Sequence, residues 1–473
     1  MRIQCRLNDT VASERSLTDH QISPQEQAIP QIARKEKLRL LPLIAATYFM
    51  VSGGPYGLED IIGLAGYKVA LLLLGIVPFF WSLPTALMVG ELASAIPTEG
   101  GFYIWVKQAM GPFWGFQEAW LSLAASVFDM AIYPTLFVLY LGRIAPTYTI
   151  GFRGPLWALA VILACTLWNL RGAKAVGESS IFLFCALLFP FVVMVIVALW
   201  HWHGHGTGAL LQPLTKSDFA GALSVCLWNY MGWDNASTVA QEVDDPQRNY
   251  PRAMIGSAVL VALTYMLPVI AVALAGLSAS QFNSDANGGT GSWTDAARII
   301  AGPIIALLVV VGGMINGAGM FNPLMMSYAR LPFAMAEDGL APKFLTRLNR
   351  AGVPWLSIIF CAIIWSLALT LKFEKLISID LVLYGGGLIL EFVALAILRK
   401  REPDMHRPFR IPGPNIVATL IGIGPTLLIA FALYAARDEK IAGLNALLFS
   451  FLIAISGSIV YASTATLRRK PSA

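Results

Sequence analysis

The sequence is poor in charged residues, which excludes an ordinary soluble domain. Only 13% of its 473 residues are Asp, Glu, Lys or Arg, whereas 57% are hydrophobic and the mean hydropathy is +0.66. A soluble domain carries roughly 25% charged residues. Apolar runs of roughly 20 residues, each long enough to cross a bilayer, recur about twelve times from residue 40 to residue 465. The chain is therefore predicted to be an all-α, multi-pass protein embedded in a lipid bilayer.

Several motifs that carry chemistry are also missing. The five cysteines are scattered singly and form no metal or redox motif. No glycine-rich phosphate loop is present, so ATP-driven transport has no support. The apolar runs offer neither a metal cluster nor a nucleophile–base pair. We expect no enzyme, no cofactor and no bound metal.

The basic residues indicate the orientation in the membrane. Most of the 33 Lys and Arg residues fall between spans on the side of the amino terminus. Loops rich in Lys and Arg stay in the cytoplasm, so both termini are predicted to be cytoplasmic, and the host membrane is taken to be the cell membrane. The net charge of +5 then reflects topology, and no nucleic-acid partner is expected. Residues 1–33 are polar and lack an apolar core, so we expect a disordered tail without a signal peptide.

The first apolar run is interrupted at residues 51–60, which read VSGGPYGLED. Proline removes a backbone donor and glycine weakens a helix, so the backbone is predicted to unwind there. Unwound backbone at membrane depth must be buried in protein or line a watery cavity. A break of this kind is the best sequence indication of a transporter's binding site.

A second break is predicted in span 6, where Asn229, Gly232 and Asp234 interrupt the apolar run. Spans 1 and 6 lie five spans apart and cross the membrane in opposite senses, as an inverted five-plus-five repeat requires. The predicted organisation is a tail at 1–39, a first repeat at 40–200 (spans 1–5), a second repeat at 201–400 (spans 6–10), a basic loop at 401–413, spans 11 and 12 at 414–465, and a tail at 466–473.

Four carboxylates fall within spans: Glu59, Asp129, Asp234 and Glu391. Each central charge costs about 2.5–3.5 kcal/mol on insertion scales. No Lys or Arg lies in the middle of a span to pair with them. They are therefore protonated, solvated in a cavity or paired with an arriving cation. The alternatives are that Asp129 and Glu391 are neutral acids bonded between helices, and that Glu59 caps the half-helix after the break. Asp60, Glu91 and Asp380 lie nearer span ends and are expected to reach the interface.

Aromatic residues gather at the same breaks, and rings beside carboxylates suit ammonium groups. The half-helix after Gly54 also points its positive end at the predicted cavity, which would suit a carboxylate. The residues expected to contact substrate are Ser52, Gly53, Gly54, Tyr56, Glu59, Trp228, Tyr230, Trp233 and Asp234. Those expected to carry a coupling proton are Asp129, Asp234 and Glu391. Span 8 has no Ser or Thr between Gly302 and Met326, which favours H⁺ over Na⁺ as the coupling ion.

Segments spread over nearly the whole apolar region resemble the amino acid–polyamine–organocation transporter superfamily, and within it the plant-type polyamine uptake branch. These segments are residues 51–60, 111–117, 133–137, 228–238, 242–251, 335–339, 389–392 and 407–412. The resemblance implies a leucine-transporter-like fold and proton-driven uptake of polyamines or amino acids, and it places family acids at Glu59, Asp234 and Glu391.

The chain departs from this pattern at three positions. Asp129 stands where an Asn is expected, Leu324 where the polyamine branch tends to carry an acid, and Leu187 where many proton-coupled relatives carry a lysine. We expect a secondary active transporter of cationic amines or amino acids, coupled to H⁺. The rival hypothesis is an exchanger of neutral or cationic amino acids, in which N–H groups of the break hold the substrate carboxylate.

Overall fold

The computed structural model describes residues 37–201, 217–282, 292–369, 376–435, 437, 440–441 and 444–468. Within these ranges the regular structure is helical apart from a short antiparallel pair of strands, β1 (Lys440–Ile441) and β2 (Leu444–Asn445), and two isolated β-bridges. The predicted all-α class is confirmed. The tails predicted before residue 37 and after residue 468 lie outside the described residues.

The first half of the chain forms long helices joined by short turns. They are α1 (Leu40–Val51), α2 (Leu58–Phe80), α3 (Ser82–Ala95), α4 (Phe102–Met110), α5 (Pro112–Ile144), η1 (Pro146–Tyr148), α6 (Arg153–Asn169) and α7 (Ala173–Trp200).

The second half has more short and 3₁₀ elements. They are α9 (Phe219–Asn229), η2 (Asp234–Thr238), η3 (Ala240–Glu242), α10 (Pro246–Leu274), η4 (Ala279–Phe282), α12 (Ser292–Ala301), α13 (Pro303–Tyr328), α14 (Arg330–Glu337), η5 (Lys343–Thr346), α15 (Trp355–Ala368), α16 (Leu376–Arg401), α17 (Asn415–Leu420), α18 (Ile423–Ala435) and α19 (Ala446–Arg468).

Eight segments of the described chain are long and apolar enough to cross a membrane. One of them combines α2 and α3. Within α2 the helix is kinked at Gly66, which has a positive φ of 76°. Large apolar side chains such as Phe182 and Ile304 are 73% exposed, as lipid-facing residues are. The structure therefore supports a polytopic membrane protein.

Both predicted breaks are present. Helix α1 ends at Val51 and α2 begins at Leu58, with left-handed backbone at Gly54 and Gly57 between them. Helix α9 ends at Asn229, and the chain continues through Gly232, with a φ of 93°, into the 3₁₀ turn η2. Sequence did not predict that the second half of span 6 would be 3₁₀ rather than α-helical.

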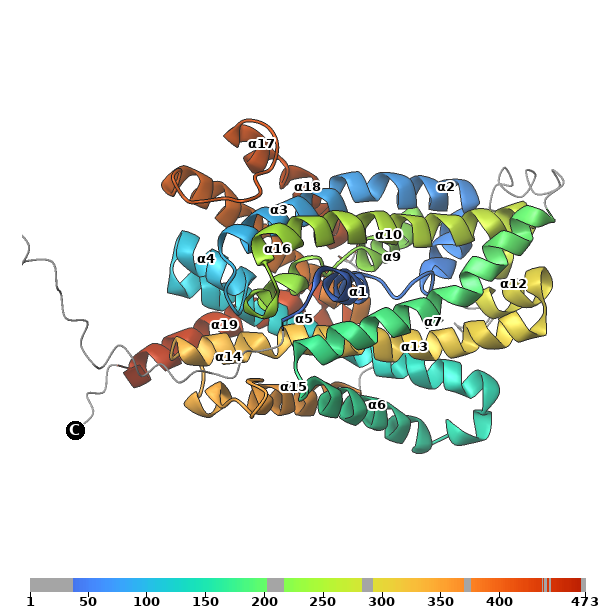
Figure 1. Ribbon diagram of the computed structural model, residues 1–473, viewed down its shortest axis with the longest axis horizontal. Coiled ribbons are helices and arrows are strands. Elements are labelled where there is room, and N and C mark those ends of the chain that lie inside the picture. The colour runs from blue at the N-terminus through green and yellow to red at the C-terminus, as the bar shows by residue number, and fades with distance from the viewer. Residues whose placement is uncertain are drawn as a thin grey trace, which may run out of the picture. The chain divides into compact units, whose positions relative to one another are not determined.

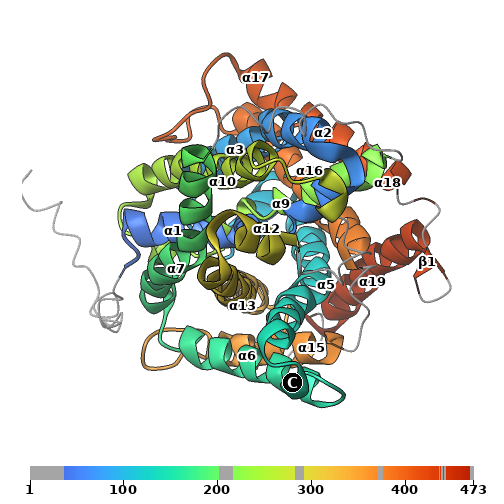
Figure 2. The same ribbon diagram turned by 90° about the vertical axis from the view of Figure 1, so that its right-hand side faces the viewer.

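The two breaks lie against each other near the middle of the helices. A Cβ built on Gly232 would fall 2.2 Å from the Met50 carbonyl, and one on Gly57 would fall 3.3 Å from Asn229 Oδ1. Helix α13 packs beside them between α5 and α7 (Figure 2). One end of the helices carries α4 and α14, and the other carries α12 (Figure 1). We call the first end the α4 side, defined by α4, α14 and residues 402–414.

The α4 side is held by buried ion pairs that the sequence did not predict. Arg330, which is 1% exposed, binds Glu242 and lies 3.6 Å from Glu99. Arg399 binds Glu91, and Arg407 lies 3.3 Å from the same carboxylate. Glu91 was expected to reach the interface, but it is fully buried because these two guanidinium groups and the Ile411 amide enclose it.

Candidate functional site

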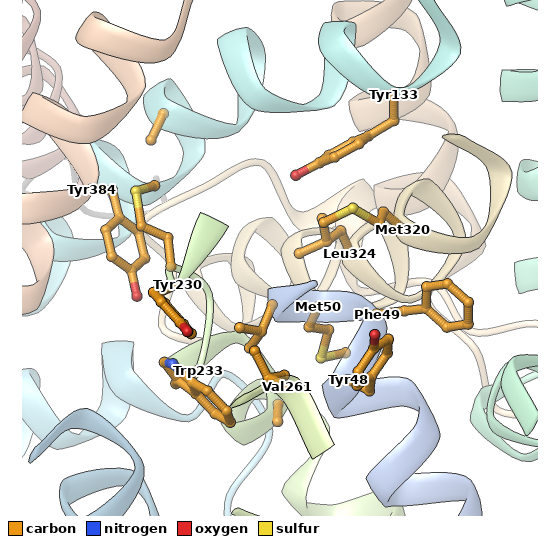
Figure 3. Packing of buried hydrophobic residues seen from close by; sticks show 14 of the residues in the cluster. Tyr48, Phe49, Met50, Tyr133, Tyr230, Trp233, Val261, Met320, Leu324 and Tyr384 are labelled. Atoms are coloured by element: carbon orange, nitrogen blue, oxygen red, sulfur yellow. The ribbon is translucent and has the colours of Figure 1, made fainter. Parts of the chain in front are cut away.

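A cavity of about 620 Å³ lies where the two breaks meet. Its wall combines residues 50–60, α5, the end of α9 and residues 228–235, α13 and Tyr384 of α16. Figure 3 shows Met50, Tyr133, Met320, Leu324 and Tyr384, which all line this cavity, around one space. The predicted link between helix breaks and an internal chamber is thus present in the structure.

Side-chain hydrogen bonds stabilise the unwound backbone of the first break. The Gly54 amide donates to Ser52 Oγ at 3.0 Å. The Pro55 carbonyl accepts a hydrogen bond from Trp293 Nε1 at 2.9 Å. Tyr56 donates its hydroxyl to the Val309 carbonyl at 2.6 Å. The first two bonds give partners to backbone groups that the break leaves without helical hydrogen bonds, as backbone inside a membrane requires, and the third fixes Tyr56 to α13.

Glu59 accepts a backbone hydrogen bond and also lines the cavity. Its Oε2 accepts from the Gly57 amide at 2.7 Å and from Trp293 Nε1 at 2.7 Å. The alternative that Glu59 caps the half-helix is therefore what the geometry shows, and the same residue also lines the cavity with Asp60. Acidic residues at a helix N-terminus are stabilised by its dipole.

The second break is satisfied from neighbouring helices. Its freed carbonyls accept from remote donors: Asn229 from the Tyr265 hydroxyl at 2.6 Å, and Tyr230 from Trp81 Nε1 at 3.1 Å. Tyr384 accepts from the Gly232 amide at 3.0 Å and donates to Asp234 Oδ1 at 2.5 Å. Tyr384 therefore joins α16 to the break and orients the Asp234 carboxylate.

The residues predicted to contact substrate or to carry the coupling proton divide into two groups. Gly53, Tyr56, Glu59, Asp129 and Trp228 line the cavity. The others lie behind its wall and are buried: Ser52, Gly54, Tyr230, Trp233, Asp234 and Glu391. The second group supports the wall, with Asp234 reaching it through Tyr384.

Asp129 stands on α5 with a partner from its own helix. It is 6% exposed, and Oδ1 accepts from the Tyr133 hydroxyl at 2.6 Å. Asp380 of α16 interacts with it electrostatically, and the Trp228 side chain lies near both carboxyls. Asp380 was expected to reach the interface, but it is 1% exposed because α16 packs this turn against α5.

Two positions that depart from the family pattern also face the breaks. Leu324 lines the cavity with an apolar side chain. Leu187 packs against Gly54, because its Cδ2 would lie 2.6 Å from a Cβ there. An aliphatic side chain therefore covers the first break at the position where the resemblance led us to expect a lysine.

Sequence reasoning missed several wall residues. Asn316 and Asn229 present amides to the cavity, and Tyr133, Tyr140 and Tyr328 add rings. The amides were detectable as polar residues inside apolar spans, whereas the tyrosines carry no signal that separates a cavity wall from ordinary packing.

Comparison with known proteins identifies the family to which this chain belongs. The family model described as amino acid permease matches residues 44–441, which is most of the chain. This chain is a member of the amino acid permease family. Its relatives are transporters and not enzymes, and the family lies within the superfamily that the sequence resembles.

Named relatives of this permease fall into two groups. It is 33% identical to a probable polyamine transporter of Arabidopsis thaliana over 419 residues, 88% of this chain and 83% of the relative. It is 33% identical to a polyamine transporter of Oryza sativa subsp. japonica, covering 85% and 75% of the two chains. It is 27% identical to a serine/threonine exchanger of Bacillus subtilis, covering 80% and 85%.

Proposed function

We propose that this permease carries cationic amines, polyamines foremost, by proton-coupled alternating access. The observation that carries the proposal is the charge of the chamber. Glu59 and Asp129 line it and are buried, and none of the described residues that form its wall is Lys, Arg or His. Buried carboxylates in a wall without Lys, Arg or His favour a substrate that brings positive charge.

The amide groups of the first break argue against a substrate carboxylate. The Gly57 amide donates to Glu59, the Gly54 amide to Ser52, and the Leu58 amide to the Pro55 carbonyl. These donors are occupied by the protein itself. The half-helix end that could attract an anion already holds two acids in its first turn, Glu59 and Asp60.

The remaining wall suits an ammonium chain. Tyr56, Trp228 and Tyr384 present aromatic rings, which attract cations over their faces. The carboxylates come from separate elements, Glu59 and Asp60 from α2 and Asp129 from α5. Acids on different walls suit a di- or polyamine, and the plant relatives that match most of this chain are named as polyamine transporters.

Proton coupling is proposed on three buried acids, of which only Asp129 lines the chamber. Asp129, Asp234 and Glu391 are buried without a basic partner in the described chain. Helix α13 has no hydroxyl side chain between Gly302 and Met326 that would bind Na⁺. An acid that gives up its proton as the amine arrives would couple the two movements.

The finer architecture belongs to the proposal. We assign twelve spans arranged as two inverted repeats, because the breaks of α1–α2 and α9–η2 meet and polar residues interrupt both. The α4 side is proposed to face the cytoplasm of the cell membrane, since residues 399–410 carry a cluster of Lys and Arg.

The test is uptake of labelled putrescine into proteoliposomes with an imposed pH gradient. We expect spermidine to compete and serine to compete poorly. Asp129→Asn should raise the apparent KM for putrescine about 10- to 100-fold, because a charged hydrogen bond contributes about 1.5–3 kcal/mol. Glu178→Gln, an acid 58% exposed on α7, is the matched control and should behave as the parent.

The second candidate function, amino acid exchange, has one observation in its favour. Three amides, of Asn229, Asn235 and Asn316, line the chamber and can bind a neutral polar substrate. The relative named as a serine/threonine exchanger covers most of the chain. Strong competition by serine together with none by spermidine would favour exchange and overturn the polyamine assignment.

A further inference from the structure

Another buried acid, Glu118, lies on α5, closer to the α4 side than the chamber. Glu118 is fully buried, and its Oε1 accepts from Ser122 Oγ at 2.8 Å. Its Oε2 has no hydrogen-bond partner in the described part of the chain. It does not line the chamber, so the proposed substrate site does not account for it.

The helix opposite brings a second unpartnered acid to this place. Gly387 of α16 lies so close to α5 that a Cβ on it would be 3.5 Å from Glu118 Oε1 and 3.3 Å from Ser122 Oγ. Glu391 follows four residues later, so it lies on the same face of α16. Glu391 is 1% exposed, its Oε2 also lacks a partner among the described residues, and it interacts electrostatically with Glu118.

The acids of the two helices form two levels. Glu118 and Asp129 stand eleven residues apart on α5, and so do Asp380 and Glu391 on α16. Eleven residues are three helical turns, about 16 Å. Asp129, which lines the chamber, interacts electrostatically with Asp380, and Glu118 interacts in the same way with Glu391 three turns nearer the α4 side.

Asp234 connects the two levels. It lies in the second break and interacts electrostatically with both Glu118 and Glu391. Its Oδ1 accepts a hydrogen bond from the Tyr384 hydroxyl. Tyr384 itself lines the chamber. Carboxyl and hydroxyl groups therefore lead from the chamber to the inner pair.

The basic groups of the elements packed around this pair are engaged elsewhere. Arg399, two turns further along α16, binds Glu91 of α3. Lys107 of α4 binds Asp338 at 2.5 Å. On α5 and α19, the neighbouring polar groups are neutral, with Gln117 donating to the Ala454 carbonyl. In the described ranges no Lys, Arg or His pairs with Glu118 or Glu391.

We propose that Glu118 and Glu391 share a proton and form an inner proton site between the chamber and the α4 side. Two buried carboxyls that repel each other in a low-dielectric interior disfavour double ionisation, so the proposal places one proton on the pair. The site takes a second proton from Asp234 and releases one toward the α4 side. Each transfer breaks one O–H bond and forms one, and no other bond changes. This inference rests on the proton coupling proposed above.

The transport test separates proton movement from substrate movement. Counterflow of labelled putrescine needs no net proton transfer, whereas accumulation driven by a pH gradient does. We expect Glu118→Gln to lower pH-driven accumulation by about tenfold or more, as loss of a proton-transfer group does, while counterflow falls by a much smaller factor. Glu178→Gln should change neither. Accumulation by Glu118→Gln that matches the parent would overturn the inner site.

A second measurement needs no substrate. The infrared C=O band of protonated carboxyl groups, recorded on purified protein in detergent, should lose intensity in the Glu118→Gln/Glu391→Gln double variant. If the double variant does not fold, each single variant should shift or weaken the band. An unchanged band would show that the pair holds no proton. If the parent shows counterflow but no response to a pH gradient, the proposed proton coupling is wrong. The infrared C=O band would still report whether the Glu118–Glu391 pair is protonated.

Discussion

Gly53 is a residue at which the first break admits no side chain. A Cβ there would fall 1.9 Å from Asn316 Oδ1 and 2.6 Å from Asn316 Cγ. The glycine thus lets the amide of α13 lie directly on the unwound backbone at the cavity wall. The sequence singled out this glycine as a helix breaker, but its role in admitting Asn316 depends on a residue more than 260 positions away.

Gly53→Ala is therefore predicted to displace Asn316 and lower transport. A clash of this size in a packed interior costs about 1–3 kcal/mol, so putrescine uptake should fall roughly 5- to 100-fold. Uptake by proteoliposomes measures the effect, with protein amount equalised after size-exclusion chromatography.

Gly75→Ala is the matched control for that substitution. Gly75 lies on α2, where a new Cβ would meet only Met266 Cε at 3.8 Å, an ordinary contact. Uptake by this variant should equal that of the parent. Equal losses in both variants would mean that helix propensity, and not Asn316, explains the defect.

The elements that close the α4 side are tied by Arg330 at the start of α14. Its guanidinium binds Glu242 at the end of η3, lies 3.6 Å from Glu99 and donates to the Met326 carbonyl. Because Arg330 is 1% exposed and Glu242 is 4% exposed, loss of the Arg330 charge would break a buried ion pair. Removing one partner of a buried pair costs about 3–5 kcal/mol.

Arg330→Met is predicted to lower the unfolding temperature in detergent markedly, and the Arg330→Met/Glu242→Gln double variant should recover part of the loss. Arg248→Ala provides the comparison, since Arg248 is 75% exposed in a pair with Asp245 and an exposed pair contributes at most about 1 kcal/mol. If the double variant were no more stable than Arg330→Met, the Arg330–Glu242 ion pair would not be what stabilises the contact between α14 and η3.

How far sequence could predict these elements depends on the range of the interactions. The break at residues 51–60 follows from local chemistry, because glycine and proline fail in helices wherever they stand. The 3₁₀ turn η2 does not, since its carbonyls are satisfied by remote hydroxyls: Tyr250 donates to Ala236, and Ser327 to Asn235. Likewise, Glu118 stands near the start of an apolar run and was not predicted to be functional. Its interaction with Glu391 arises only because α16 packs closely against α5.

At the scale of the whole molecule, the segment before α1 is joined to the chain that follows the second break. Leu38 forms a parallel bridge with Val243: its amide donates to the Glu242 carbonyl at 2.8 Å, and its carbonyl accepts from the Asp244 amide at 2.8 Å. Glu99 forms a second bridge, antiparallel, with Val239. Two strand-like contacts thus join the chain before α1, the α3–α4 turn and the exit of the second break. The proposed alternating access predicts that these contacts open when substrate is released on the α4 side.

Cross-linking these contacts is predicted to stop transport reversibly. Bridged residues lie close enough for a disulfide, so Leu38→Cys/Val243→Cys should form one under mild oxidation. Oxidised protein should lose at least about nine-tenths of putrescine uptake and counterflow, since both need the α4 side to open, and dithiothreitol should restore them. Each single cysteine variant serves as the control for oxidation of the native cysteines, of which Cys185 is exposed. Full uptake by the cross-linked protein would mean that substrate leaves by another route, and the rocking of the two breaks about their shared chamber would then have to be abandoned.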